Sequence, residues 1–199
     1  EGLCAIEAKC FIDCTGDADV AYFAGAPTWN GDKRNGLMQP ATLFFEMGGL
    51  DREAFVGTLE EKKEKGELGI PAHNCWSWYL EEARKNGDWN IQRDEIGNYE
   101  MPIRNRWKMN CTRIPGIDAT KTEDVTRGLI EGRKQVQEVM NFMRKYVPGC
   151  ENAELVQVAS ALGIRETRHV CGLKTLVVDD LLNCRVPEDS ILLAANSVD

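Results

Sequence analysis

The feature that most constrains the fold is a long amphipathic segment at residues 123–146. Glu123 and Asp124 place negative charge where the dipole of a helix favours it, and Pro148-Gly149 ends the segment. Apolar residues recur at the three- and four-residue spacing of one helix face: Val125, Leu129, Val136, Met140, Met143 and Val147. The spacing therefore predicts a long helix with one buried stripe.

The rest of the chain predicts an α+β fold, with a mixed, mostly antiparallel sheet packed with helices. Strands are expected where apolar and polar residues alternate, and helices where a capping residue opens an apolar-periodic segment that Gly closes. The expected strands are residues 3–12 (short strands with a turn between them), 41–47, a hairpin within 96–114, 155–162, 170–177 and 191–195. The further helices are 20–25, 51–65, 74–86 and 179–183. The polar, turn-rich stretch 28–36 is the candidate domain boundary.

Composition excludes several kinds of partner. The 199 residues hold 24 Lys and Arg against 32 Asp and Glu, a formal net charge of -8 without a basic cluster, so neither nucleic acid nor an anionic membrane surface is expected as a partner. No apolar run approaches the roughly 20 residues that span a bilayer. Glu1 in place of Met and the apolar run 191–195 close to the end suggest a piece of a longer protein.

The eight cysteines show no C-x-x-C pair. A chain of this length can bury enough apolar surface to fold without disulfides, so we expect buried free thiols that act as small hydrophobic side chains. Metal and iron–sulfur sites usually use paired short spacings, so no metal site is expected. Free thiols favour a cytoplasmic location. The cysteines are Cys4, Cys10, Cys14, Cys75, Cys111, Cys150, Cys171 and Cys184.

Two short segments could carry chemistry. Residues 12–19 end a strand-like run in a small acidic turn, where Gly16 would let backbone amides approach a bound cofactor; an ordinary surface turn explains them as well. Residues 163–169 gather two arginines, a glutamate and a histidine. They could hold a substrate carboxylate or phosphate, or form a solvated charged strand with a local ion pair. Residue pattern alone leaves both alternatives open.

Five motifs in fixed order resemble the bacterial FAD-dependent oxidoreductases grouped with the heterodisulfide reductase A-like flavoproteins. The first resembles a flavin-contacting turn in which A-T-G-D-G-D is usual, although Cys14 and Ala18 depart from that pattern. The last is the signature G-I-R-E-T-R. The motifs are residues 11–27, 36–44, 110–120, 126–135 and 163–168.

The resemblance implies a flavin domain of two dinucleotide folds with an inserted substrate domain. Residues 1–30 would end the FAD-binding lobe, and residues 31–199 would form most of the substrate domain, with a possible return to the FAD lobe near the C-terminus. The family's G-x-G-x-x-G would precede Glu1, and a segment that closes over the flavin would follow Asp199. FAD would then belong to the full-length parent and would not be retained by these residues alone, which would be inactive by themselves.

The resemblance also suggests residue roles. Arg165 and Arg168 would anchor an anionic small-molecule substrate or stabilise the charge of reduced flavin, Glu166 would orient one of them, and His169 could transfer a proton. The expected cofactor contacts are Thr15, Gly16 and Asp17, and the expected substrate contacts are Gln39, Thr42 and Arg113. Two other functions remain open: a non-catalytic cap or interaction module that works with the rest of its parent chain, and part of an iron–sulfur flavoprotein electron carrier.

Overall fold

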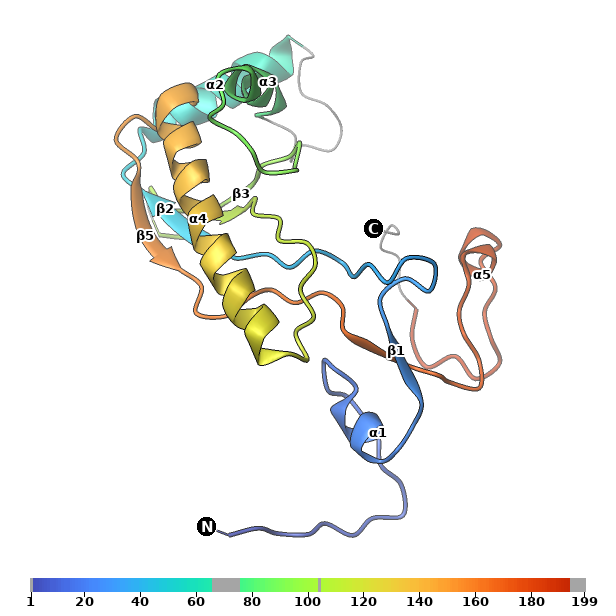
Figure 1. The fold of residues 1–199 in the computed structure, drawn as a ribbon. Helices are drawn as coiled ribbons and strands as arrows, with labels where there is room; N and C mark the ends of the chain where they lie inside the picture. The colour runs from blue at the N-terminus through green and yellow to red at the C-terminus, as the bar shows by residue number, and fades with distance from the viewer. Residues whose placement is uncertain (1, 66–75, 104, 194–199) are drawn as a thin grey trace.

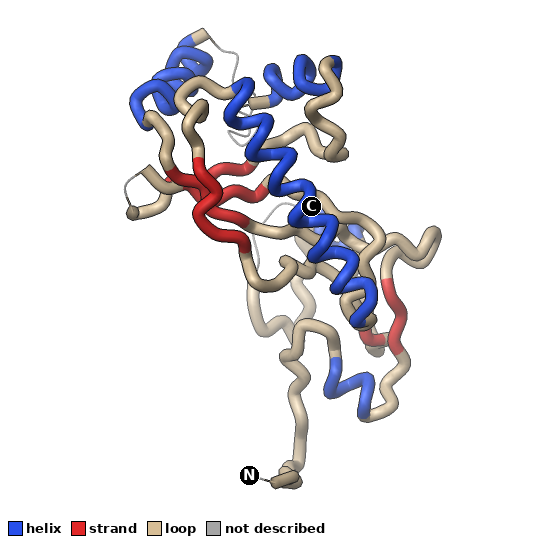
Figure 2. Tube along the Cα trace, turned by 60° about the vertical axis from the view of Figure 1, so that its left-hand side comes forward, coloured by secondary structure: helices blue, strands red, loops and turns tan. Residues whose placement is uncertain are grey.

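The computed structural model describes residues 2–65, 76–103 and 105–193 and confirms an α+β fold. Its centre is a four-stranded antiparallel sheet in the order β3-β4-β2-β5, and helix α4 crosses one face of that sheet in both ribbon views (Figures 1 and 2). The sheet and this helix use β2 Phe45–Gly48, β3 Gly97–Glu100, β4 Trp107–Asn110, β5 Glu154–Val158 and α4 Thr122–Tyr146.

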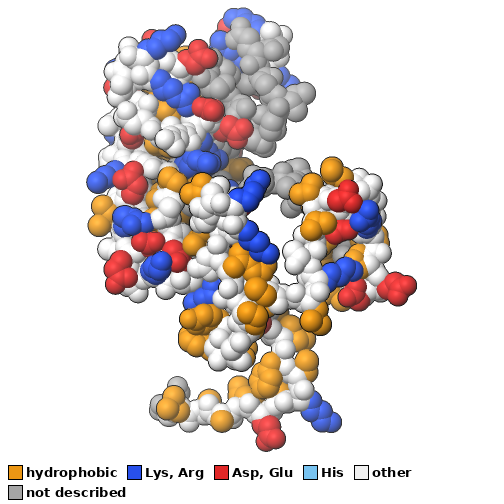
Figure 3. Space-filling model, turned by 45° about the vertical axis from the view of Figure 1, so that its right-hand side comes forward, with side chains coloured by type: hydrophobic (Ala, Val, Ile, Leu, Met, Phe, Trp, Pro, Cys, Tyr) orange, Lys and Arg blue, Asp and Glu red, His pale blue; other side chains and the backbone are white. Residues whose placement is uncertain are grey.

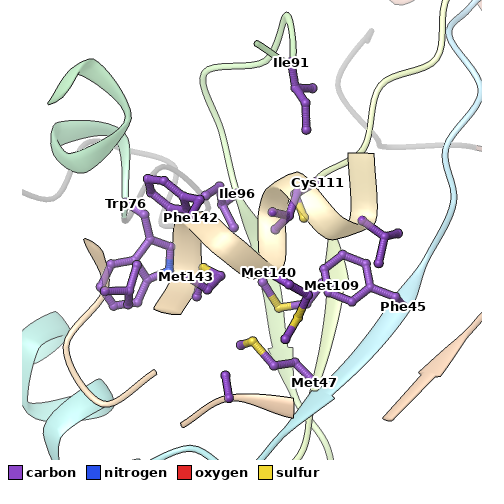
Figure 4. Close-up of a cluster of buried hydrophobic side chains, with 14 of the residues drawn as sticks. Phe45, Met47, Trp76, Ile91, Ile96, Met109, Cys111, Met140, Phe142 and Met143 are labelled. Atoms are coloured by element: carbon purple, nitrogen blue, oxygen red, sulfur yellow. The ribbon is translucent and has the colours of Figure 1, made fainter. Parts of the chain in front are cut away.

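Strand register places one set of side chains on the face that α4 covers. Phe45 pairs with Met109, and Met47 pairs with Trp107, all four of them buried. Because successive residues of a strand point to opposite faces, the intervening Glu46 lies on the other face. The core between the sheet and α4 is aromatic and sulfur-rich, as Figure 4 shows. The pairing of β2 with β5 shifts at Glu46/Met47, which is consistent with a bulge.

Helix α4 approaches the sheet closely at two glycines on its buried face. A Cβ added to Gly132 would lie 2.9 Å from Leu43 Cβ and 3.0 Å from Ile114 Cδ1. A Cβ added to Gly128 would lie 2.6 Å from Leu162 Cδ1. The missing side chains therefore set the distance between α4 and the chain beneath it.

Two shorter helices, α2 Arg52–Glu64 and α3 Ser77–Lys85, lie near the C-terminal end of α4 (Figure 1). The Asp51 carboxylate accepts hydrogen bonds from the amides of Glu53 and Ala54, so it caps α2 as the sequence predicts. Phe55 of α2 contacts Trp107, with ring centroids 4.7 Å apart. This contact ties α2 to the sheet. We call residues 41–65 and 76–163 the main body.

A small lobe is formed by residues 13–30 and 167–193, and residues 2–12 precede it without helix or strand. Its sheet is a two-stranded antiparallel ribbon of β1 Thr28–Asn30 and β6 Arg168–Val170, with the short helices α1 Asp19–Phe23 and α5 Val178–Leu182 nearby (Figure 1). Two connections reach the small lobe from the main body, residues 31–40 and 164–166. They lie beside each other, because Thr42 and Gly163 form a β-bridge and the Gln39 amide donates to Glu166.

Several expectations about the small lobe and the ends of the chain were wrong. Residues 3–12 form no strand and expose Leu3, Ile6, Phe11 and Ile12. The strand expected at 170–177 ends at Val170, residues 191–193 are not a strand, and residues 194 and 195 lie outside the described residues. Figure 3 shows hydrophobic side chains exposed along the N-terminal segment at the bottom of the view. No helix within the described residues is long and apolar enough to cross a membrane.

The cysteines also differ from the expectation. Cys111 and Cys150 are buried free thiols, as predicted. Cys75 lies outside the described residues. The other described cysteines fill no core. Cys4, Cys10 and Cys171 lie in segments that were expected to be strands and are not, while Cys14 lies in the turn and Cys184 follows α5. The exposed free thiols are Cys4, Cys10, Cys14, Cys171 and Cys184.

Candidate functional site

The two segments that the sequence singled out, residues 13–19 and 163–169, contact each other directly. Thr167 Oγ1 donates to Asp17 Oδ1 at 2.6 Å. The Arg168 guanidinium donates from the same nitrogen to the Asp17 carbonyl at 2.8 Å and to Asp19 Oδ1 at 2.6 Å. Thr167 is only 3% exposed, so its hydroxyl is a buried anchor for the turn. The small lobe therefore assembles one site from segments about 150 residues apart.

Asp13 organises the turn from within. Its carboxylate accepts from the Thr15 amide at 2.9 Å, the Thr15 hydroxyl at 2.7 Å and the Ala21 amide at 2.8 Å. The Ala21 amide and the two Thr15 donors lower the pKa of Asp13. Thr15 Oγ1 in turn accepts from the Asp19 amide at 2.8 Å. These local bonds fix the backbone of residues 13–21.

Ala18 lies in the left-handed region, with φ 53°. This conformation costs a residue with a Cβ about 1 kcal/mol, and glycine adopts it freely. The position is one of the two at which the chain departs from the A-T-G-D-G-D pattern. The turn thus keeps the backbone shape that suits glycine while carrying alanine.

The outer side of the turn is open. Gly16 is exposed, and a Cβ added there would have no neighbour within 4 Å. Within the described residues, no acceptor is bonded to the backbone N–H groups of Gly16 and Asp17. Thr15 is also exposed. The turn therefore offers backbone donors to a ligand without a side chain at Gly16 to obstruct it.

Arg168 is committed to holding this turn. Its side chain is 14% exposed, and its guanidinium carbon lies 4.2 Å from the ring centroid of Tyr22 in α1. Its charge is balanced by Asp19. A paired, stacked and largely buried guanidinium positions its partners more than it attracts an anion from solvent.

His169 lies in a different setting from Arg168. Its ring stacks on Trp29, with centroids 5.2 Å apart and planes 17° from parallel. His169 Nε2 is 2.7 Å from Glu166 Oε1, and the second Glu166 oxygen accepts the Gln39 amide at 2.6 Å. Glu166 therefore orients His169 and the connection at Gln39. The orientation of an arginine by Glu166 stays a prediction beside these two bonds.

The pairing of β1 with β6 explains why the neighbouring residues Arg168 and His169 have different surroundings. Trp29 is opposite His169, and Asn30 is opposite Arg168. Successive strand residues point to opposite faces, so Arg168 faces the turn and α1 while His169 faces away from them. The structure therefore separates the predicted catalytic residues: Arg168 lies at the turn, next to Thr167, while Glu166 and His169 lie on the other face. Arg165 lies in the connection at residues 164–166.

The predicted substrate contacts lie where the small lobe joins the main body. Thr42 is 8% exposed and forms a β-bridge with Gly163, while Ala41 forms one with Ile114. Gln39 is exposed next to Glu166. Arg113 is exposed, and Gln135 bonds both its backbone amide (2.8 Å) and its carbonyl (2.9 Å). The three residues thus lie on adjoining segments, although the buried Thr42 serves mainly to join them.

Arg165 is exposed at this junction and, unlike Arg168, is not part of the turn. The sequence did not single out Trp29 or Tyr22, which pack against His169 and Arg168. Trp29 lies in the stretch interpreted as a polar boundary. The signal that could have located it is the Thr28-Trp29-Asn30 alternation followed by Gly31, which has φ 65° and no room for a Cβ.

A separate hollow of about 270 Å³ lies on the open face of the main sheet. Phe44, Glu46, Lys108 and Gln157 line it from the face opposite the core. Glu46 is held by Arg106 at 2.8 Å, and Lys108 lies over the Phe44 ring. None of the residues that the sequence predicted for the site lines this hollow.

Comparison with known proteins connects the chain to one family. The sequence matches the model of a protein family described as FAD dependent oxidoreductase, over residues 1–199. The match includes both the turn at 13–19 and the segment at 163–169. None of the curated proteins and none of the solved structures matches the chain.

Proposed function

The chain belongs to the FAD-dependent oxidoreductases, and from that premise we propose that its small lobe contributes part of the flavin contact and its main body the substrate domain. The observation that supports this proposal most directly is the contact of Thr167 and Arg168 with the turn at Asp17. We further infer a relationship to the heterodisulfide reductase A-like group of bacterial flavoproteins, on the five ordered motifs. We also propose a domain division at residue 30, with a return to the flavin lobe near the C-terminus; the pairing of β1 with β6 supports it.

The residues at the turn fit a dinucleotide cofactor. Gly16 leaves space above the backbone, and the N–H groups of Gly16 and Asp17 can donate to hydroxyl or phosphate oxygens. Thr15, Gly16 and Asp17 are the proposed cofactor contacts. Bound FAD would accept hydride or electrons from the substrate. The protein would position the two reactants and supply charged groups around them.

The remaining residues have separate proposed roles. Arg165 and Arg113, both exposed at the junction of the lobes, would attract an anionic small-molecule substrate. Gln39 would line the same junction. Arg168 would hold the turn, and Glu166 would orient His169, which would move a proton. We propose a cytoplasmic location, because cysteines remain free thiols in a reducing compartment and the described cysteines are free.

Replacing Thr167 by Val in the full-length parent protein, freed of FAD before titration, tests the proposal. Val keeps the shape of Thr but cannot donate to Asp17, and a hydrogen bond to a charged group contributes about 1.5–3 kcal/mol. If turn order is required for binding, the Kd for FAD should rise about 10- to 100-fold. Quenching of flavin fluorescence on titration measures this Kd.

Thr58→Val is the matched control, because Thr58 Oγ1 bonds only within α2, to the Ala54 carbonyl, far from the turn. It should leave the Kd for FAD unchanged. Thr167→Ser, which keeps the hydroxyl, should recover most of the affinity. If Thr167→Val binds FAD as tightly as the unaltered protein, the turn at Asp17 does not contribute to the flavin contact.

A further inference from the structure

The imidazole of His169 is held at one face and one edge. Trp29 stacks on the ring at 5.2 Å, and Glu166 Oε1 lies 2.7 Å from Nε2. Within the described chain, no donor or acceptor is bonded to Nδ1. The side chain is 43% exposed, so this ring is fixed and yet reachable from solvent.

The contact with Glu166 determines where the proton of neutral His169 lies. A carboxylate can only accept hydrogen bonds, and the second Glu166 oxygen already accepts one from the Gln39 amide at 2.6 Å. The ring must therefore donate from Nε2. In a neutral imidazole one nitrogen donates and the other accepts, so Nδ1 keeps its lone pair.

Trp29 keeps the ring in this orientation. The register of the ribbon places Trp29 directly opposite His169, so the two side chains share a face of β1 and β6. Lys33 Nζ lies 4.2 Å from the centroid of the Trp29 ring, and this contact holds the indole in turn. Without the indole, the His169 ring would be restrained by a single hydrogen bond and free to rotate about it.

We propose that Trp29 is a positioning residue which, together with Glu166, holds His169 with its proton on Nε2 and presents Nδ1 as the proton acceptor of the site. This inference rests on the proposed function, because the proton to be accepted is one that a substrate loses during oxidation. A substrate with hydrogen on oxygen or nitrogen gives up that hydrogen as a proton and a neighbouring carbon-bound hydrogen as hydride. Nδ1 would take the proton and the ring would become imidazolium, while the substrate would gain a double bond. Bound FAD, which the family uses, would supply the acceptor for the hydride.

NMR of the ¹⁵N-labelled protein tests the inference without substrate or flavin. The chain has two histidines, so His169→Gln assigns the His169 signals by their loss. In neutral His169, the ¹⁵N chemical shift of Nε2 should be that of a protonated ring nitrogen, and the shift of Nδ1 that of an unprotonated one. The ring proton signals should be shifted upfield by the stacked indole of Trp29. Diethyl pyrocarbonate should acylate the same ring at its free nitrogen, as detected by peptide mass spectrometry.

Trp29→Leu should abolish the upfield shift of the His169 ring protons, and Trp29→Phe, which keeps an aromatic face, should recover part of it. Tyr22→Leu is the matched control, because it removes an aromatic ring from the other face of the ribbon, beside Arg168. It should leave the His169 signals in place. If Trp29→Leu does not fold, the partial effect of Trp29→Phe decides the question.

Two results would overturn the inference. The first is a His169 ring with its proton on Nδ1 in the unaltered protein, and the second is a set of ring signals that Trp29→Leu leaves unchanged. Failure of the proposed function would look different, since Thr167→Val would then leave FAD binding unaffected while the His169 signals remained as expected. In that case His169 would have no flavin reaction to serve, and its role as proton acceptor would be rejected. The location of its proton on Nε2, and the dependence of the ring orientation on Trp29, would still hold.

Discussion

The close approach of α4 to the main sheet should make Gly132 and Gly57 respond in opposite ways to alanine. Alanine in place of glycine inside a helix adds about 1 kcal/mol of stability. At exposed Gly57 in α2 a new Cβ meets nothing within 4 Å, so Gly57→Ala should raise the free energy of unfolding by about that amount.

At Gly132 the same propensity gain is opposed by overpacking. The new Cβ would lie 2.9 Å from Leu43 Cβ, an atom next to the backbone of a side chain that is 1% exposed and cannot move aside. Inserting a methyl group into a packed core costs typically about 1–3 kcal/mol. Gly132→Ala should therefore be up to about 2 kcal/mol less stable than the unaltered protein, and about 1–3 kcal/mol less stable than Gly57→Ala.

Gly128→Ala lies between these cases. Its nearest neighbour is Leu162 Cδ1, the far end of a partly buried side chain that can rotate, at 2.6 Å. Urea unfolding followed by circular dichroism measures all three variants on one scale. A Gly132→Ala protein as stable as Gly57→Ala would show that α4 can shift outward without cost, and would refute the close-packing explanation.

Two further predictions concern thiols and pH. Burial raises the pKa of Cys111 and Cys150 to about 12, so iodoacetamide should modify these two only after denaturation; modification of either in the folded protein, seen by mass spectrometry, would contradict their burial. Although burial opposes its ionisation, bonds from Thr120 and Lys121 hold the pKa of Asp118 below its ordinary value, so Asp118 stabilises the fold above about pH 4 and this stabilisation fades as pH falls further. Asp118→Asn should therefore lower the free energy of unfolding at neutral pH, with the difference from the unaltered protein shrinking in acid; a difference independent of pH would contradict this assignment. In the thiol experiment, iodoacetamide should modify the exposed cysteines without denaturation; these are Cys4, Cys10, Cys14, Cys171 and Cys184.

The main body could be predicted from sequence because its signals are local and agree with one another. The stripe from Val136 to Met143 predicts the buried face of α4, and the alternation of Trp107 and Met109 predicts the inward face of β4. Asp51 marks the start of α2 within one residue. In each case the pattern that forms the element is the same pattern that packs it.

The small lobe could not be predicted in this way, because a strand requires a partner as well as a pattern. Residues 3–12 have apolar positions typical of strands but no neighbouring strand among the described residues, so they remain extended and exposed. The prediction of buried thiols at Cys4 and Cys10 failed for the same reason. Local periodicity reports which residues suit a strand and is silent on what they pair with.

The site was predicted as two separate motifs and not as one assembly. Residue types alone indicated that the Gly16 turn and the 163–169 segment could carry chemistry. Their meeting depends on the register of β1 with β6, which no local signal specifies. The opposite directions of Arg168 and His169 follow from the alternation of side chains along β6, which required β6 to be placed correctly first. Trp29 was missed because the polar, turn-rich composition of residues 28–36 led to a boundary assignment for a stretch that begins with a three-residue strand.

The ribbon that joins Thr28 to Val170 also has a consequence for the order of folding. Closing a chain loop costs more entropy as the loop lengthens, and residues 28 and 170 are far apart in an unfolded chain. Once the main body has formed, the bridge between Thr42 and Gly163 shortens the distance that remains to be closed. The ribbon, and with it the contact between Thr167 and Asp17, should therefore form last and open first, so that the turn at residues 13–19 can unfold locally while the main body stays folded.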